Sequence, residues 1–236
     1  MTAWFPDLDT VVTAAPGTGS TSLMSACLDA PGAIDPVATL VRVDHDHVDG
    51  PVDPKHATWS RIREHLPTTP SDSRAADGTD PDTVRHVVTA TRDPWDFYLA
   101  EWTRLRTRWA LELDQPDSWV HRVAGVRDSI RAATTLDFDD WILHEFAADM
   151  ETGDSERRLN RGHVDEATVV VRMEHLDHDL ARLHPDLARR IGPIPHLNRT
   201  DRGRDLAAAY SQRSARIVAD AHAADIARFG YAFPTP

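Results

Sequence analysis

Residues 10–28 read TVVTAAPGTGSTSLMSACL, and this stretch decides the fold. Its first half is apolar and β-branched, which is typical of a buried strand. A proline and a glycine then end the run, and residues 20–28 have helical spacing with hydroxyl side chains at the start that can cap a helix. We therefore predict a strand, a tight glycine turn and a helix in direct succession.

The rest of the chain repeats this alternation of strands and helices. Further apolar runs predict strands at residues 38–43, 84–91 and 167–172. Spacing and capping predict helices at residues 56–65, from 94 onward, and at 138–146, 176–187 and 211–229. Because helices between apolar strands cover both faces of a parallel sheet, we predict a three-layer α/β fold with a central parallel sheet flanked by helices.

The length of 236 residues fits one domain, which we place at residues 1–236. Residues 67–83 (PTTPSDSRAADGTDPDT) are polar and hold no large apolar side chain, so we expect an exposed loop there. The chain has a single cysteine, Cys27, which excludes an intrachain disulfide and fits a reducing cytoplasm.

Charge and hydropathy exclude several classes of partner. The chain has 38 acidic and 26 basic residues, a net charge of −12 with neutral histidines. Binding along a nucleic-acid backbone needs a basic surface, so we predict no nucleic-acid partner. No apolar run approaches the roughly 18 residues of a transmembrane helix, so we expect no membrane span. The first residues are acidic and carry no positive charge, unlike a signal peptide, and we expect a cytoplasmic protein.

The turn after the first strand has the composition of a phosphate-binding loop. Glycines let the backbone turn tightly, amides at a helix N-terminus point at an anion, and hydroxyls add donors. The predicted cofactor-binding residues are Gly17, Thr18, Gly19, Ser20, Thr21 and Ser22. A nucleoside-triphosphate P-loop needs Gly-Lys-Ser/Thr, and Ser20 stands where that lysine would be. The alternative is a strand-to-helix turn without a ligand.

A second candidate anion-binding residue, Arg92, follows the predicted strand at 84–91. Asp93 and Pro94 then start a helix, Asp93 as the cap and Pro94 at the first helical position. A guanidinium at this end of a central strand suits a phosphate bound through two hydrogen bonds. The alternative is an ion pair between Arg92 and Asp93 or Asp96.

Six motifs in this order resemble those of the sulfotransferases that use 3′-phosphoadenosine 5′-phosphosulfate (PAPS). They are the loop at 16–23, Lys55-His56, Arg92-Asp93-Pro94, residues 138–142, residues 170–176, and a C-terminal signature at 196–200 and 225–233. The branch it resembles modifies carbohydrates (sulfotransferase family 2-like), and the resemblance covers nearly the whole chain. It implies a P-loop-like fold, PAPS as co-substrate, no metal, and sulfuryl transfer to a hydroxyl of a carbohydrate or small molecule.

The resemblance also implies roles for single residues. The loop at 17–22 would hold the phosphosulfate and Arg92 the 3′-phosphate, with Arg199 of the C-terminal signature as a further cofactor-binding candidate. Lys55 and His56 would be catalytic, with His56 as the base that takes the acceptor's proton. The alternative for His56 is a surface histidine at a helix start.

This sequence departs from the family at two positions. The family's loop lysine is Gly17 here, and a serine that follows the arginine motif is Ala100. Losing such a charge contact costs about 10²–10³ in rate unless another cation replaces it. The candidates for that replacement are Lys55, Arg42, Arg172, Arg199 and Arg202. We expect Gly17→Lys to be tolerated unless the backbone at Gly17 needs a positive φ.

Two other functions stay open on the sequence: a small-molecule kinase of the P-loop type, and a catalytically degenerate sulfotransferase-like protein that only binds nucleotide. The acidic and histidine-rich stretch 44–49 has metal-ligand residue types, but it is more typical of a solvated acidic edge. Trp102 and Trp109 have the spacing of helix-face core residues, whereas Trp59 or Trp95 could stack on adenine or a sugar.

Overall fold

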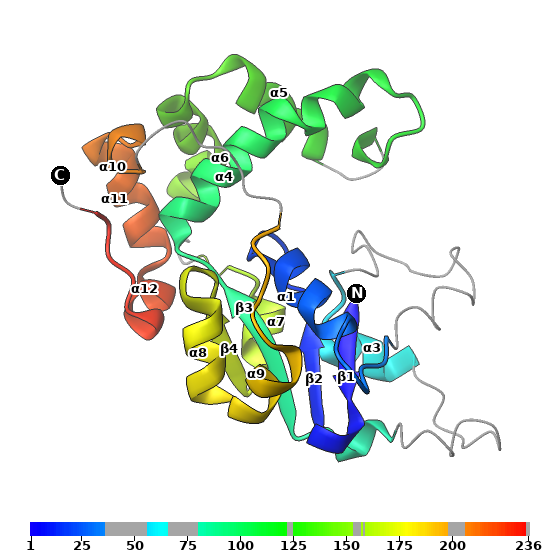
Figure 1. Ribbon diagram of the computed structural model, residues 1–236. Helices are drawn as coiled ribbons and strands as arrows, with labels where there is room; N and C mark the ends of the chain where they lie inside the picture. The colour runs from blue at the N-terminus through cyan, green and yellow to red at the C-terminus, as the bar shows by residue number, and fades with distance from the viewer. Residues whose placement is uncertain are drawn as a thin grey trace. The chain divides into compact units, whose positions relative to one another are not determined.

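The computed structural model describes residues 1–35, 56–65, 80–121, 125–152, 157, 159–197 and 206–234. The chain divides into two compact units (Figure 1). Unit 1 comprises Met1–Arg92 and Asn160–Asn198, and unit 2 comprises Asp93–Leu159 and Arg199–Pro236. The predicted strand at 38–43 and residues 67–79 of the predicted polar loop lie outside the described residues. The assignment of the whole chain to one domain stays a prediction.

Unit 1 is built on a four-stranded sheet in the order β1-β2-β3-β4. The strands are β1 (Thr2–Phe5), β2 (Thr10–Thr13), β3 (His86–Thr91) and β4 (Val169–Arg172). β2, β3 and β4 run parallel, whereas the edge strand β1 pairs antiparallel with β2. The sheet is therefore mixed and mostly parallel, and the wholly parallel sheet of the prediction is corrected by β1.

Helices pack on both faces of this sheet (Figure 1). Those of unit 1 are α1 (Ser20–Leu28), α3 (Trp59–His65), α7 (Arg161–Glu166), α8 (Leu176–Leu183) and α9 (Pro185–Ile191), with 3₁₀ turns at Pro6–Leu8, Pro81–Thr83 and Met173–His175. Side chains alternate along a strand, so Val12 packs with Leu23 of α1 while its neighbour Val11 packs with Trp59 of α3. Cys27 of α1 is fully buried in the first of these clusters. The predicted α/β class is confirmed.

Unit 2 consists of helices around an aromatic core. Its helices are α4 (Pro94–Thr107), α5 (Val126–Thr135), α6 (Phe138–Thr152), α10 (Leu206–Ala209), α11 (Gln212–Ala221) and α12 (Ala223–Phe229), with 3₁₀ helices at Trp109–Asp114 and Trp119–His121. Trp102 is buried against Phe138, as the spacing along α4 predicts, while Trp109 is only partly buried.

Two predicted helices are each broken in the structure. The predicted helix at 176–187 ends at Leu183, and α9 begins at Pro185. A proline has no amide hydrogen and fits the first position of a new helix, which explains the break. The predicted helix at 211–229 breaks at His222, between α11 and α12, and it ends at Gly230 as predicted, with φ of +70°.

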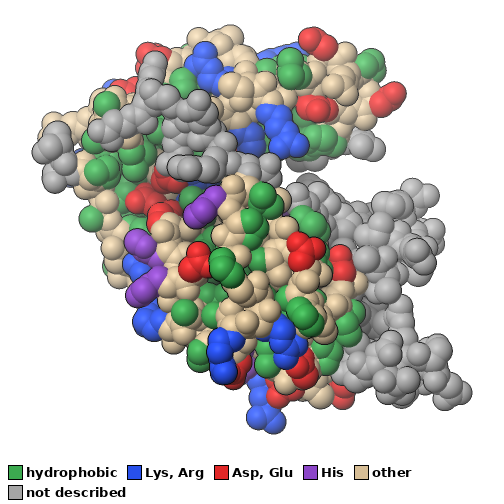
Figure 2. All heavy atoms as spheres, viewed as in Figure 1, with side chains coloured by type: hydrophobic (Ala, Val, Ile, Leu, Met, Phe, Trp, Pro, Cys, Tyr) green, Lys and Arg blue, Asp and Glu red, His purple; other side chains and the backbone are tan. Residues whose placement is uncertain are grey.

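No helix in the described ranges is long and apolar enough to cross a membrane. On the face drawn in Figure 2, acidic and basic side chains are interspersed.

Candidate functional site

The loop between β2 and α1 begins at the carboxyl end of β2, and it depends on two glycines. Gly17 and Gly19 both have left-handed backbone angles, with φ of +74° and +71°. Side-chain-bearing residues rarely adopt these angles because their Cβ crowds the backbone. α1 then begins at Ser20 with Gly19 as its N-cap. The strand, glycine turn and helix predicted from the sequence are therefore present in that order.

Four successive backbone carbonyls of this segment each accept a hydrogen bond from a side chain. Three donors come from other parts of unit 1 and one from the loop itself. The pairs are His56 Nδ1 with the oxygen of Ala14 (2.7 Å), Thr18 Oγ1 with Ala15 (2.9 Å), Asn160 Nδ2 with Pro16 (3.0 Å) and Arg92 Nη1 with Gly17 (3.0 Å). Each backbone carbonyl of residues 14–17 is thus held by a side chain.

This arrangement sets the direction of the loop amides. The described peptide bonds include no cis bond, and in a trans peptide the N–H points opposite to the preceding carbonyl. The amides of Gly17 and Thr18 therefore point away from Asn160 and Arg92. At the start of α1 the amide of Ser22 already donates to the carbonyl of Gly19 at 2.9 Å, so the amides that lack an acceptor within the helix are those of Ser20 and Thr21. The loop and the start of α1 can thus donate several hydrogen bonds to an anion.

Arg92 lies beside the loop, as expected for an arginine at the end of a parallel strand. It follows β3 directly, and it is largely buried. The predicted cap of α4 is also present, since the Asp93 carboxylate accepts hydrogen bonds from the amides of Trp95 (2.9 Å) and Asp96 (3.3 Å). The structure therefore brings Arg92 together with Gly17, two of the predicted cofactor-binding residues.

Two predicted loop hydroxyls are engaged within the protein. Thr18 is fully buried, and its hydroxyl donates to the carbonyl of Ala15. The hydroxyl of Ser22 accepts a hydrogen bond from the amide of Leu197 at 2.9 Å. This contact brings the segment before the predicted Arg199 to the first turn of α1, but Arg199 itself lies outside the described residues. The hydroxyls of Thr18 and Ser22 are therefore both engaged by groups of the protein itself.

The hydrogen bond of His56 fixes which ring nitrogen is basic. A carbonyl oxygen only accepts, so Nδ1 of His56 must carry the hydrogen that it shares with the oxygen of Ala14. In neutral His56 the lone pair is then on Nε2, and a proton from a substrate would go to Nε2. Its predicted catalytic partner Lys55 lies outside the described residues.

His163 on α7 is a residue of this site that the sequence did not reveal. It is buried, and its Nε2 lies 3.1 Å from the carbonyl oxygen of His56 while its Nδ1 lies 3.2 Å from the hydroxyl of Thr13. Because the carbonyl only accepts, Nε2 of His163 is the donor. Burial is the largest of the effects that lower the pKa of His163 below its ordinary 6.5. No local pattern distinguishes it among the 13 histidines of the chain.

The lowered pKa of His163 predicts a loss of stability in acid. Between the ordinary pKa of 6.5 and the lower folded value, the unfolded chain binds a proton that the folded chain does not. The free energy of unfolding therefore falls as pH falls through this window. Urea unfolding at pH 7.5 and about pH 5.5 should show a smaller drop for His163→Gln than for the wild type. Equal drops in both proteins would contradict this prediction.

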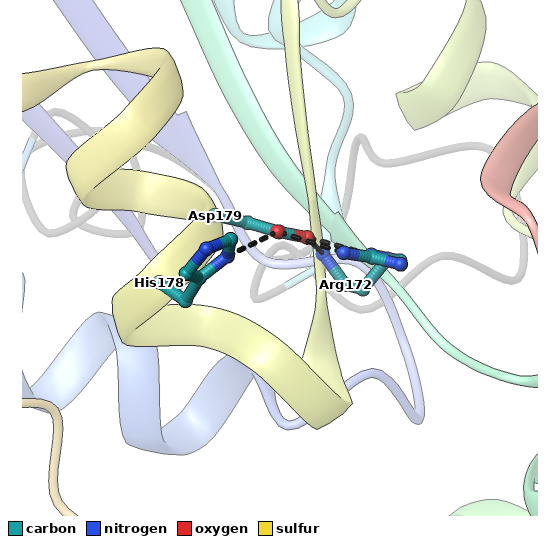
Figure 3. Close-up of polar contacts among 3 residues, drawn as sticks. All are labelled: Arg172, His178 and Asp179. Atoms are coloured by element: carbon teal, nitrogen blue, oxygen red, sulfur yellow. Dashed lines mark hydrogen bonds and ion pairs between the residues drawn. The ribbon is translucent and has the colours of Figure 1, made fainter.

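Arg172 is one of the cations that could replace the family's loop lysine, and it is held by an aspartate (Figure 3). It ends β4 opposite Thr91 of β3, and its Nε and Nη2 donate to the two carboxylate oxygens of Asp179 at 2.8 and 2.9 Å. His178 Nδ1 lies 3.2 Å from the same carboxylate. Hydrogen bonds from Arg172 hold the pKa of Asp179 far below its usual range. Much of the charge of Arg172 is thus balanced within the protein.

The left-handed backbone at Gly17 also changes what its substitution is expected to do. With φ of +74°, a lysine here would be strained by about 1–2 kcal/mol. The condition under which we expect Gly17→Lys to be tolerated, a backbone without positive φ, is therefore not met. The other departure, Ala100, is buried in α4 of unit 2, and its methyl group offers no hydrogen-bond donor.

The two tryptophans considered for stacking are both core residues. Trp59 packs edge-on against Trp4 with 5.9 Å between ring centroids, and Trp95 donates its Nε1 hydrogen to the carbonyl of Ala215 at 2.9 Å. Both are buried. Their rings are therefore occupied by packing within their own units.

Among the described residues, no three side chains of the types His, Cys, Asp and Glu gather as a metal site would require. The stretch 44–49 and three of the candidate cations, Arg42, Arg199 and Arg202, lie outside those residues.

The comparisons with known proteins leave the family unassigned: no family model, no curated protein and no solved structure matches the chain.

Proposed function

We propose that the chain is a PAPS-dependent sulfotransferase that transfers a sulfuryl group to a hydroxyl of a carbohydrate or small molecule. In this proposal the mixed sheet and its helices form a P-loop-like three-layer fold. The loop at 17–22 binds the phosphosulfate end of the co-substrate. The observation that carries the proposal is the set of four successive loop carbonyls bound by His56, Thr18, Asn160 and Arg92.

This set supports anion binding because it prepares the loop before any ligand arrives. A flexible glycine loop would lose conformational freedom on binding, and side chains that already fix it reduce that cost. The same contacts turn the amides of Gly17 and Thr18 away from the protein's own donors. In the proposed complex these amides and those at the start of α1 bind the sulfate and 5′-phosphate oxygens.

The proposed reaction needs positioning, charge stabilisation and a base. The acceptor hydroxyl attacks sulfur, its proton goes to Nε2 of His56, and a new sulfur–oxygen bond forms. The bond from sulfur to the bridging oxygen breaks, and adenosine 3′,5′-bisphosphate leaves with that oxygen. Arg92 contributes a guanidinium for the 3′-phosphate while it also holds the carbonyl of Gly17.

Arg92→Ala is expected to lower the affinity for adenosine 3′,5′-bisphosphate about tenfold to a hundredfold. A charged hydrogen bond contributes about 1.5–3 kcal/mol, and the variant loses one. The affinity for AMP should fall less, because AMP has no 3′-phosphate and is affected only through the loop carbonyl that Arg92 holds. Isothermal titration measures both ligands. Arg85→Ala is the matched control, because Arg85 lies at the opposite end of β3 and is highly exposed beside Asp9. Unchanged affinity for the bisphosphate in Arg92→Ala would contradict the proposal.

Gly17 supports a second candidate, a degenerate sulfotransferase-like protein that binds the nucleotide without turnover. Its left-handed backbone disfavours the lysine that the family uses. Transfer of labelled sulfate from PAPS to a panel of hydroxyl acceptors separates the two, because product formation excludes the binding protein. Tighter binding of ATP than of the bisphosphate would instead favour the kinase alternative.

A further inference from the structure

Helix α7 connects the glycine loop to the segment that carries His56. Three of its residues, counting its N-cap, hydrogen-bond to one or the other, and a side chain at a fourth position would meet the segment of His56. Asn160 donates to the carbonyl of Pro16 (3.0 Å), His163 contacts the carbonyl of His56 (3.1 Å), Glu166 accepts from the amide and hydroxyl of Ser60 (2.9 and 2.5 Å), and a Cβ on Gly162 would lie 3.2 Å from Thr58 Cγ2. α7 therefore holds both parts of the candidate site at a defined spacing.

His163 is the one member of this set whose hydrogen bonds reach both β2 and His56. Its Nε2 must donate to the carbonyl of His56, so in the neutral ring Nδ1 accepts from the hydroxyl of Thr13. Thr13 is the last residue of β2, directly before Ala14. His163 thus ties the backbone of His56 to Thr13 at the end of β2. The carbonyl of the next residue, Ala14, accepts the hydrogen bond from the imidazole of His56.

We propose that His163 is a positioning residue: it holds the backbone of His56 so that the imidazole keeps Nδ1–H on Ala14 and presents Nε2 as the basic nitrogen. This inference rests on the proposed function, in which Nε2 of His56 takes the acceptor's proton. Small displacements of a catalytic group cost up to about a hundredfold in rate, so the support of His56 matters as much as its presence.

The neutral form of His163 is part of this role. Within the part of the chain that the structure describes, the charged or titratable groups that face it are Glu166 on its own helix, His56, and the amino group of Met1. A proton on Nδ1 would place a second donor against Thr13, whose hydroxyl would have to turn. Burial opposes that charge, so His163 stays neutral near pH 7.

The test compares His163→Gln, which keeps one donor and one acceptor, with His163→Leu, which keeps neither. Two-bond ¹H–¹⁵N spectra of ring-labelled protein identify the protonated nitrogen of each histidine, and the signals of residues 56 and 163 are assigned by their loss in His56→Gln and His163→Gln. We expect Nδ1–H at His56 in the wild type and in His163→Gln, and a mixture of both tautomers in His163→Leu.

Turnover gives a second readout. With any acceptor that the wild type sulfates, His163→Leu should lose about tenfold to a hundredfold in kcat, and His163→Gln should recover most of that loss. Affinity for adenosine 3′,5′-bisphosphate should change less than kcat, because the anion contacts lie on the loop. A fall in affinity as large as the fall in kcat would overturn the positioning role.

The spectra separate failure of this inference from failure of the proposed function. An unchanged His56 tautomer in folded His163→Leu would overturn the inference. If that variant does not fold, the spectra of the wild type still test the inference. A neutral His163 with its hydrogen on Nδ1, or a charged His163 at pH 7, would overturn the inference equally. A tautomer shift in a protein without any turnover would support the positioning of His56 and contradict only the sulfotransferase proposal.

Discussion

Asp179→Ala is expected to lower the free energy of unfolding by about 2–4 kcal/mol, because it removes the buried carboxylate that accepts three hydrogen bonds from Arg172. The Asp179 carboxylate is nearly fully buried and accepts bonds from the backbone amide, Nε and Nη2 of Arg172 at 3.1, 2.8 and 2.9 Å. The effect stays below the largest values for buried pairs, because Arg172 keeps some contact with water. Urea unfolding of both proteins at pH 7 measures it.

Asp186→Ala is the matched control for this substitution. Asp186 also lies in the first turn of a helix and also pairs with an arginine, Arg189, but both partners are highly exposed. Exposed pairs contribute about 0–1 kcal/mol, so this variant should be close to the wild type. Equal losses in the two variants would show that burial of the Asp179 carboxylate contributes nothing.

The difference in the free energy of unfolding between the wild type and Asp179→Ala should depend on pH, in a direction set by the pKa of Asp179. The folded pKa of Asp179 is lowered from 3.8, so the stabilisation is complete above 3.8 and is lost as pH falls through the folded value. The gap between the wild type and Asp179→Ala should therefore narrow in strong acid.

Gly19→Ala is expected to lower the free energy of unfolding by about 2–5 kcal/mol through two separate effects. A left-handed residue with a Cβ costs about 1–2 kcal/mol, and overpacking adds about 1–3 kcal/mol. Gly19 has φ of +71°, and a Cβ there would lie 2.7 Å from Cγ of Met173, which is too close for any real contact. Thermal or urea unfolding gives the total.

Gly125→Ala separates the two effects. Gly125 is also a left-handed N-cap, with φ of +79°, but a Cβ there would meet no described atom within 4 Å. Its loss should be about 1–2 kcal/mol, the backbone cost alone. In a double-mutant cycle, Met173→Ala should recover the additional loss of Gly19→Ala. Additive losses would show that Met173 already yields to the new methyl group.

Local signals in the sequence predicted the framework of the site. The helix at residues 20–28 has the predicted bounds, because a β-branched run and a glycine turn point to the same boundary. The predicted hydroxyl cap is wrong: Gly19 is the N-cap, and no side chain caps the helix. Arg92 meets the loop because the ends of parallel strands share one edge of a sheet. The break at Pro185 was also readable from the sequence, but the continuous apolar spacing around it suggested one helix.

Other features left no local signal. β1 is only Thr2–Phe5, and its strand character depends on pairing with β2 rather than on its own periodicity. Asn160 donates to the carbonyl of Pro16, which lies 144 residues earlier in the sequence. His163 contacts the carbonyl of His56, which lies 107 residues earlier. Such contacts follow from the tertiary fold, and no spacing within α7 encodes them.

The rate at which the buried thiol of Cys27 is alkylated can report local unfolding of unit 1. Cys27 is the only cysteine of the chain, it lies fully inside the core beside the sheet, and burial raises its pKa to about 12. Alkylating reagents react with the thiolate, and the folded unit holds almost no thiolate at neutral pH. Each alkylation event therefore records an excursion in which α1 has left the sheet, and the reaction rate measures how often that happens while the helices of unit 2 contribute no signal.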